Sequence, residues 1–276
     1  MWQGSEMKKI VFNILISGYL VLFILIGEIP DGLFHIYFFD IGQGDSIFIT
    51  TPSNHKILID GGPKNNVLEK LGSAIPFFDK EIDLIVLTHP HSDHLDGLLE
   101  VIKRYEVRAL LITGVYFESS GYDEFIDLLI AEGVPVFIAN SNTDFRFGDV
   151  LLDIVFPLVP IAGEEMKEVN NSSIVLKVLY GKTKILLTGD LEAEAEHLLI
   201  MANDQLDADI LKAGHHGSKT SSSNNFIKAI SPNTAVISVG KDNTFGHPSE
   251  ETLNTFEKAG IKTYRTDEKG TIEFIF

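Results

Sequence analysis

The chain has 276 residues, enough for one large domain or two small ones, and its 45% apolar and 22% charged residues are typical of a globular protein rather than a disordered one. Its 22 basic and 39 acidic residues give a net charge of −17, which argues against a protein that coats nucleic acid. It has no cysteines, so disulfides and thiolate metal sites are excluded, and a transition metal would have to be bound by His, Asp, Glu, Asn or water.

The first predicted element is a helix at the N-terminus. Lys8 and Lys9 precede an almost uninterrupted apolar run from Ile10 to Ile26, at the short end of the length that crosses a hydrocarbon core. We predict a transmembrane helix within an anchor segment of residues 1–30, with the following domain outside the cytoplasm, because the basic flank lies on the N-terminal side. A cleaved signal sequence and a secreted protein are the alternative.

From residue 31 onward the sequence alternates short β-rich runs with amphipathic stretches. The predicted strands are residues 33–39, 46–50, 56–60, 82–87, 108–113, 134–139, 150–156, 173–179, 183–188, 208–213, 234–239, 261–264 and 271–276. The predicted helices are residues 95–105, 122–132, 192–201, 225–230 and 250–259. Strands and helices in both halves predict an α/β domain over residues 31–276, with sheets covered by helices.

Four side chains with metal-binding chemistry come directly after the apolar run of residues 82–87. They are His89, His91, Asp93 and His94. In a turn after a buried strand, the first two histidines can converge on one ion while the other two residues face a second. Two ions ~3.5–4 Å apart would hold a bridging water and lower its pKa. The cluster therefore predicts a metal-dependent hydrolase.

This spacing resembles the His-x-His-x-Asp-His signature of the metallo-β-lactamase superfamily, and other segments resemble that family too. They are Phe39–Ser46, Ile59–Gly62, Leu187–Asp190, Leu211–Ser218 and Gly246–Ser249. Together they resemble one branch, the hydrolase domain at the C-terminus of ComEC-type competence proteins. The resemblance covers roughly residues 33–276 and implies an αββα sandwich, preceded here by the predicted transmembrane helix, with the metals between the sheet edges.

The resemblance also implies roles for individual residues. His89 and His91 match the ligands of one metal, Asp93 and His94 match those of the other, and Asp190 matches the carboxylate that bridges both. From the sequence alone, Asp190 also fits an N-cap, since a predicted helix follows it.

The pair His215-His216 is expected to divide its roles. We expect His216 to complete the second metal site and His215 to donate a proton to the leaving group. His247 is expected to contact the substrate or support a ligand, although it also fits an ordinary loop histidine. Lys219, with Lys212 and Lys241, flanks the proposed cleft, where it could hold a phosphate.

One departure from the family concerns the first metal. Many members carry a further ligand histidine, but here no histidine lies between His94 and Asp190. Residues 170–173 stand in the matching place, so an Asn oxygen or water would fill in, and Asn171 is expected to contribute to substrate binding. We expect two divalent metal ions, either zinc or manganese, and oxygen ligands would favour the harder manganese.

The first functional hypothesis is phosphodiester hydrolysis by a metal-bound hydroxide. Asp93 would orient or deprotonate the water, and His215 would protonate the leaving oxygen. The resemblance implies a nuclease acting on DNA, and the net charge favours single-stranded DNA or a smaller phosphodiester over long duplexes. The alternatives are an acyl hydrolase acting on a lactone, thioester or β-lactam, and a non-catalytic metal-binding module. The sequence indicates no protein partner.

Overall fold

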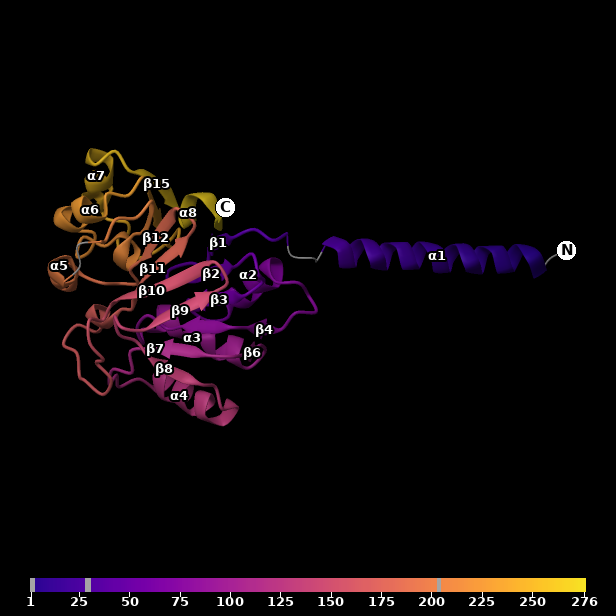
Figure 1. Cartoon of the computed structure of the whole chain (residues 1–276), viewed down its shortest axis with the longest axis horizontal. Coiled ribbons are helices and arrows are strands. Elements are labelled where there is room, and N and C mark those ends of the chain that lie inside the picture. The colour runs from indigo at the N-terminus through magenta and orange to yellow at the C-terminus, as the bar shows by residue number, and fades with distance from the viewer. Residues whose placement is uncertain (1–2, 28–30, 203–204) are drawn as a thin grey trace.

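Two seven-stranded sheets face each other in the part of the chain that the structure describes (Figure 1). This computed structural model describes the backbone of residues 3–27, 31–202 and 205–276, with the side chains of residues 6–19 in the first range. The first sheet contains β1 (His35–Phe38), β2 (Ile47–Thr50), β3 (Lys56–Ile59), β5 (Leu84–Val86), β7 (Leu110–Ile112), β8 (Val136–Ile138) and β16 (Ile272–Ile275). The second contains β9 (Asp144–Phe147), β10 (Val150–Phe156), β11 (Val175–Tyr180), β12 (Thr183–Leu187), β13 (Ile210–Lys212), β14 (Thr234–Ile237) and β15 (Lys262–Arg265). A small additional sheet pairs β4 (Glu81–Ile82) with β6 (Glu106–Val107).

Helices cover the outer face of each sheet. The described helices are α1 (Gln3–Gly27), α2 (Asn66–Ala74), α3 (Ser92–Ile102), α4 (Ser120–Glu132), α5 (Ala193–Ala202), α6 (Asn224–Ile230), α7 (Glu250–Lys258) and α8 (Thr266–Lys269), with 3-10 turns at Val169–Ser172 and Gly214–Gly217. The sets α2–α4 and α5–α7 lie on opposite sides of the paired sheets, and α1 projects away from them (Figure 1).

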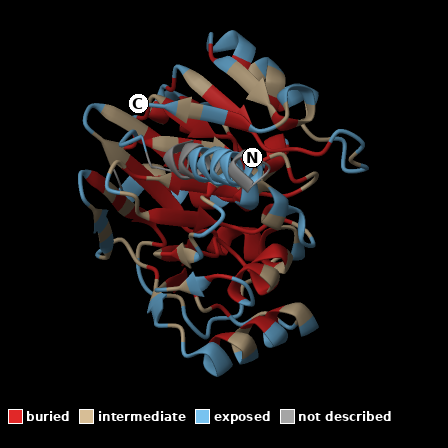
Figure 2. Cartoon of the chain, turned by 90° about the vertical axis from the view of Figure 1, so that its right-hand side faces the viewer, coloured by how far each residue is buried: buried red, intermediate tan, exposed pale blue. Residues whose placement is uncertain are grey.

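Alternating side chains along the strands divide the core into three layers. In β3, Ile57 and Ile59 pack between the two sheets, whereas Leu58 packs on the other face with residues of α2 and α3. In β12, Leu186 likewise points outward and packs with Leu199 of α5. Figure 2 shows the buried residues concentrated on the central strands and the inward faces of the helices. Because each strand side chain alternates in direction, this arrangement confirms the predicted αββα sandwich.

The two sheets share a local order of strands. In the first sheet, the antiparallel pair β2–β3 is followed by β5 and β7, each parallel to its neighbour. In the second, the antiparallel pair β11–β12 is followed in the same way by β13 and β14. The carboxyl ends of β3, β5, β12 and β13 therefore provide four loops at corresponding places in the two sheets, and these loops, with the first turn of α3, carry most of the candidate site residues.

Several described elements have no counterpart in the sequence prediction, among them β9, α2, β6 and α8. The strand β9 is short, lies at a sheet edge and alternates exposed with half-buried residues. The helix α2 buries only Val67 and Leu71 and contains Gly72. Neither element has the long apolar periodicity that identifies the other strands and helices, because each buries little surface.

The prediction of a transmembrane helix at the N-terminus is wrong. Among the described residues, no helix is both long enough and apolar enough to cross a membrane. The described side chains of α1 include the charged Glu6, Lys8 and Lys9, and charged side chains are costly inside a hydrocarbon core. The predicted boundary between residues 1–30 and 31–276 falls at residues 28–30, outside the described residues.

Candidate metal centre

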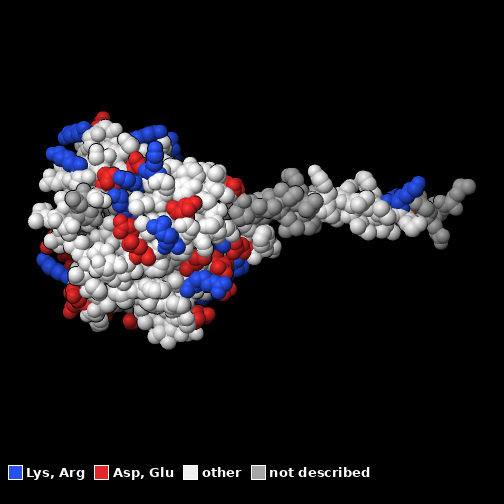
Figure 3. All heavy atoms as spheres, in the orientation of Figure 1, with Lys and Arg blue, Asp and Glu red and all other residues white. Residues whose placement is uncertain are grey.

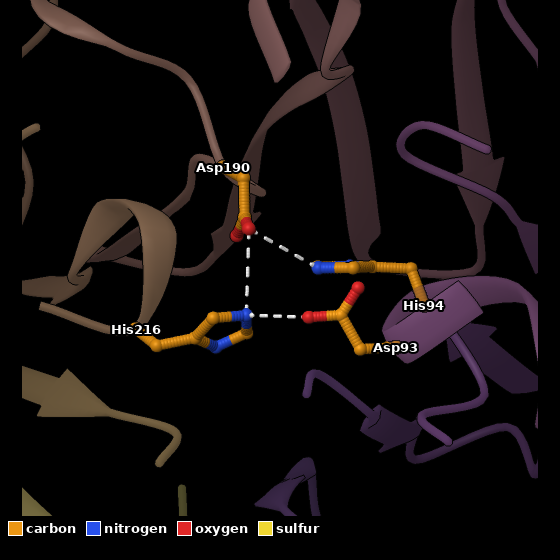
Figure 4. A group of neighbouring side chains, drawn as sticks. All are labelled: Asp93, His94, Asp190 and His216. Atoms are coloured by element: carbon orange, nitrogen blue, oxygen red, sulfur yellow. Dashed lines mark hydrogen bonds and ion pairs between the residues drawn. The ribbon is translucent and has the colours of Figure 1, made fainter. Parts of the chain in front are cut away.

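Two imidazoles and two carboxylates from both halves of the chain converge at the shared sheet edge. Asp93 and His94 lie in the first turn of α3, Asp190 follows β12, and His216 lies in the 3-10 turn after β13. One ligand atom from each residue lies within 4.8 Å of the others. Asp190 Oδ2 lies 3.3 Å from His94 Nε2 and 3.4 Å from His216 Nε2. His216 Nε2 in turn lies 3.3 Å from Asp93 Oδ2 (Figure 4). These are the residues predicted for the second metal and its bridging carboxylate.

Buried acceptors hold the far side of both imidazoles. His94 Nδ1 lies 2.8 Å from Asp60 Oδ2, and Asp60 also accepts hydrogen bonds from the Thr88 amide and hydroxyl at 2.8 and 2.7 Å. His216 Nδ1 lies 3.0 Å from the carbonyl oxygen of Ser238. An acceptor behind a ring fixes its orientation and leaves Nε2 as the free donor atom for a metal. Both Nε2 atoms therefore face the carboxylates.

A buried ion pair between Lys212 and Asp45 lies next to Asp190. The Lys212 ammonium is fully buried, pairs with Asp45, donates to the Gly189 carbonyl at 3.0 Å and lies 3.6 Å from Asp190 Oδ1. The Asp45 carboxylate also lies 3.3 Å from His216 Nδ1. Lys212 is therefore not available to hold a phosphate in the cleft, as its position in the sequence had suggested; burial and ion pairing engage it inside the protein.

Asp45 and Asp60 were not predicted as functional residues, although each lies in a turn that resembles the family. Asp45 follows Gly-Gln-Gly, and Asp60 precedes Gly-Gly with φ of +59°. An aspartate beside glycines directly after a predicted apolar strand is the signal that would have identified them, because a carboxylate buried at a strand end needs a charged or hydrogen-bonding partner.

The electrostatics of the site favour added positive charge. Burial opposes protonation of His94, but Asp190 and Asp60 outweigh it and hold the pKa of that imidazole well above its usual value. His216 shows the same pattern, with Asp190 and Asp45 outweighing burial to raise its pKa. In turn, His216 and His94 outweigh burial and hold the pKa of Asp190 well below its usual range. The carboxylates therefore stay ionised and attract cations.

The residues present fit a divalent metal ion. His94 Nε2 and Asp190 Oδ1 are buried and, in the described part of the chain, make no hydrogen bond. Both atoms take part in ion pairs instead, at 3.3 Å between His94 Nε2 and Asp190 Oδ2 and at 3.6 Å between Asp190 Oδ1 and Lys212 Nζ. Buried polar atoms that make no hydrogen bond are rare because each costs free energy, and a metal ion would satisfy both of these. Imidazole nitrogen and carboxylate oxygen are ligands of zinc, manganese and iron alike, so the donor set does not choose among them.

His89 and His91 lie beside this group without completing a second one. His89 Nε2 is 3.1 Å from His91 Nδ1, and the rings of His89 and His94 are 4.2 Å apart. His89 Nδ1 lies 3.2 Å from the Thr88 hydroxyl and 3.4 Å from that of Ser173. Among the described residues, neither histidine forms a group of three or more ligand atoms. Their predicted role at a first metal site stays a prediction.

The asparagines in place of the further family histidine have separate contacts. Asn171 Oδ1 accepts the amide N–H of Glu192 at 3.0 Å and so caps the start of α5. Asn170 Oδ1 is buried without a partner in the described chain, and Asn170 Nδ2 lies 3.5 Å from His215. Asn170 therefore lies beside His215, while Asn171 has a structural contact. No hydrogen bond in the described chain supports Asp190 as the N-cap.

His215 stands at the mouth of the group. Its Nδ1 lies 3.3 Å from Glu192 Oε1 and 3.2 Å from Thr220 Oγ1, and its Nε2 lies 3.9 Å from Asp190 Oδ2. Both His215 and His216 adopt left-handed backbone conformations, with φ of +48° and +53°. Such strain costs free energy and is concentrated at functional sites. The consecutive left-handed residues turn one imidazole into the buried group and leave the other partly exposed.

The other predicted substrate residues lie on neighbouring loops. The ring centroid of His247 is 5.4 Å from that of His215, and burial, reinforced by His215, lowers the pKa of His247 to about 4. Lys219 is exposed three residues after His216. Their roles in substrate binding stay predictions.

Comparison with known proteins agrees with this geometry. Residues 39–241 match the family model described as "Metallo-beta-lactamase superfamily". The chain is 34% identical over 254 residues to "ComE operon protein 3" of Bacillus subtilis (strain 168), covering 85% of this chain and 32% of that protein. It is 32% identical over 251 residues to "Competence protein ComA" of Neisseria gonorrhoeae, covering 89% and 33%. The chain thus spans about a third of the length of these relatives.

Among solved structures, the fold is similar to that of the metallo-beta-lactamase fold protein YhfI from Bacillus subtilis. The TM-score is 0.57 at 12% identity, over 88% of this chain and 100% of the other. At this identity the likeness concerns the fold alone, and the reaction has to be argued from the site.

Proposed function

The chain belongs to the metallo-beta-lactamase superfamily, and we propose that it is a metal-dependent phosphodiesterase that cleaves DNA strands. The observation that carries the proposal is the convergence of Asp93, His94, Asp190 and His216 within 4.8 Å at the mouth of two sheets. Similarity to competence proteins supports DNA as the substrate class, because the resemblance to ComEC-type proteins implies a DNA substrate.

We propose that the group of Asp93, His94, Asp190 and His216 holds one divalent ion. His89 and His91 would hold a second ion, and Asp190 would contribute to both sites. Two such ions would lower the pKa of a water molecule and neutralise the charge that builds on the phosphoryl oxygens. Zinc and manganese are the proposed metals.

The protein's own groups position the reacting atoms. Hydrogen bonding from His216 and the charge of His94 outweigh burial and hold the pKa of Asp93 well below its usual value. The carboxylate of Asp93 therefore stays ionised and can orient an attacking water by accepting its proton in a hydrogen bond. Because Asp93 is partly exposed while its partners are buried, it is the group of the four that solvent and substrate can reach.

His215 is the proposed proton donor to the leaving oxygen. Its Nδ1 side is held by Glu192 and Thr220, which leaves Nε2 directed toward Asp190 and the site. A ring oriented by a carboxylate on one nitrogen can present a proton on the other, as general acids require.

Single strands fit the charge of the protein better than long duplexes. The net charge is −17, and on the face that Figure 3 shows, the basic side chains of the described residues lie among acidic ones. Binding of a duplex draws much of its affinity from neutralising phosphates with Lys and Arg. A single strand that enters through a few contacts at the site needs less of this neutralisation. Action outside the cytoplasm stays a prediction, tested by locating the chain in fractionated cells.

The test is hydrolysis by the whole chain, loaded with manganese or zinc in parallel. The substrates are bis-p-nitrophenyl phosphate, a single strand of DNA and a β-lactam. We expect metal-dependent cleavage of both phosphodiesters, lost in His216→Ala and retained in His197→Ala, since His197 is an exposed residue of α5. Turnover of the β-lactam alone would replace this proposal with acyl hydrolysis. Metal binding without turnover of any substrate would favour a binding module.

A further inference from the structure

The loop between β14 and α7 carries an exposed aromatic ring beside the metal centre. Phe245 is 68% exposed, and its ring stacks on that of His247 with centroids 5.9 Å apart and planes at 25°. We propose that Phe245 is the platform on which a base of single-stranded DNA stacks while a phosphodiester of the same strand lies at the group of Asp93, His94, Asp190 and His216. This inference rests on the proposed function and specifies its substrate.

Hydrogen bonds hold this loop in place. The side chain of Asn243 donates to the His247 carbonyl at 2.7 Å and accepts the amide N–H groups of His247 and Phe245 at 3.1 and 3.2 Å. The ends of the loop are tied down as well, because Gly240 N–H donates to Gln43 Oε1 at 3.1 Å and Ser249 N–H donates to the Gly217 carbonyl at 2.9 Å. The ring is therefore presented on a preorganised loop, which lowers the entropic cost of binding.

The ring lies within reach of the reacting centre. His247 is 5.4 Å from His215 between ring centroids, and His215 Nε2 is 3.9 Å from Asp190 Oδ2. Phe245 is therefore the second ring outward from the proposed proton donor. A strand whose phosphate lies at Asp190 could pass His215 and His247 and place a base farther along it over the exposed face of Phe245.

The chemistry around the ring favours a nucleic acid strand over an apolar partner. Lys241 is exposed on the same loop, and Lys219 is exposed on the loop that carries His215 and His216. Aromatic rings interleaved with lysines are the usual surface for single strands, since bases stack on the rings and phosphates face the charges. In a duplex both faces of each base are already stacked, so this platform selects unpaired bases.

The experiment compares two strands of equal length that share one phosphodiester backbone. One is a short oligothymidine, and the other carries an abasic sugar at every position. With the whole metal-loaded chain, we expect Phe245→Ala to raise KM for oligothymidine by about tenfold to a hundredfold, the loss expected for one stacked base. KM for the abasic strand should not change, and Phe245→Trp should restore binding of oligothymidine.

The matched control is Phe78→Ala, which removes another exposed phenyl ring, 59% accessible, at the opposite end of the strands just before β4. Phe78→Ala should change KM for neither strand. Equal losses on both strands in Phe245→Ala, or no loss on either, would overturn the platform while leaving the phosphodiesterase intact. Absence of cleavage of both strands by the unaltered protein would instead refute the proposed function, and the platform with it.

Discussion

The two halves of the sandwich present different groups from the same topological positions. The strands β3 and β12 each end in a turn that contains one buried aspartate, Asp60 and Asp190, and β5 and β13 each end in a histidine loop. The two aspartates contact the same imidazole from opposite sides, with Asp60 2.8 Å from His94 Nδ1 and Asp190 3.3 Å from His94 Nε2. Corresponding places in the two sheets thus provide a carboxylate behind His94 in one case and the proposed shared metal ligand in the other.

The halves also differ in how their groups reach the site. The first half supplies four side chains from six consecutive residues, His89 and His91 in the loop after β5 and Asp93 and His94 in the first turn of α3. The second supplies Asp190, His216 and His247 from three separate loops, and His216 needs a left-handed conformation to point inward. A short motif therefore encodes one wall of the site, whereas the other wall depends on the packing of the whole sheet.

The largest effect is expected where the halves share a ligand. Asp190→Asn removes the charge that faces both His94 and His216, and we expect kcat/KM for bis-p-nitrophenyl phosphate to fall by about a thousandfold or more, since metal catalysis supplies several kcal/mol. Metal content measured after dialysis should fall in parallel. Activity within tenfold of the unaltered protein would show that Asp190 is not the shared ligand.

A smaller effect distinguishes support from ligation. Asp60→Asn leaves the ligand atoms in place but weakens the acceptor behind His94, and Asp45→Asn does the same behind His216. Loss of such a supporting carboxylate typically weakens metal binding about 10–100-fold. Titration of zinc against a competing chelator measures it. If Asp60→Asn abolished binding as fully as Asp190→Asn, the distinction between the two aspartates would be wrong.

Packing of α3 against the turn after β3 should affect stability more than catalysis. A Cβ added at Gly97 would lie 2.0 Å from the Gly61 carbonyl oxygen, so Gly97→Ala forces backbone apart. We expect a loss of ~1–3 kcal/mol in the free energy of unfolding, measured by urea denaturation. The control is Gly72→Ala in α2, where nothing lies within 4 Å and helix propensity predicts a gain of ~1 kcal/mol. Equal stabilities for the two variants would contradict this account.

The smallest effect concerns the point where the end of the chain joins the first sheet. His35 of β1 lies 2.8 Å from Glu273 of β16 and 3.0 Å from Asp31. Burial opposes protonation, but these carboxylates outweigh it and raise the pKa of His35 above 6.5. The stabilisation is therefore complete below pH 6.5 and is lost as the pH rises through the raised value.

We expect a small drop in the thermal midpoint across that pH range, absent in His35→Asn. The comparison should be made with metal bound, so that the metal centre does not titrate. The same drop in both proteins would assign the pH dependence to other groups.

The sequence determined the parts of this protein that depend on neighbours along the chain. Alternating apolar residues specified most strands, and the spacing of His89, His91, Asp93 and His94 after a buried strand indicated a metal-dependent hydrolase. These signals are readable because backbone geometry fixes how residues two, three or four apart are directed.

Only the tertiary structure decided contacts between distant segments. It placed His216 inside the group and His215 at its mouth, engaged Lys212 with Asp45, brought Asn170 rather than Asn171 beside His215 and put Asp60 behind His94. The described helices also overturned the predicted membrane span. The physical reason is that burial and through-space distance set the charge and orientation of a polar side chain, and neither quantity is a property of the local sequence.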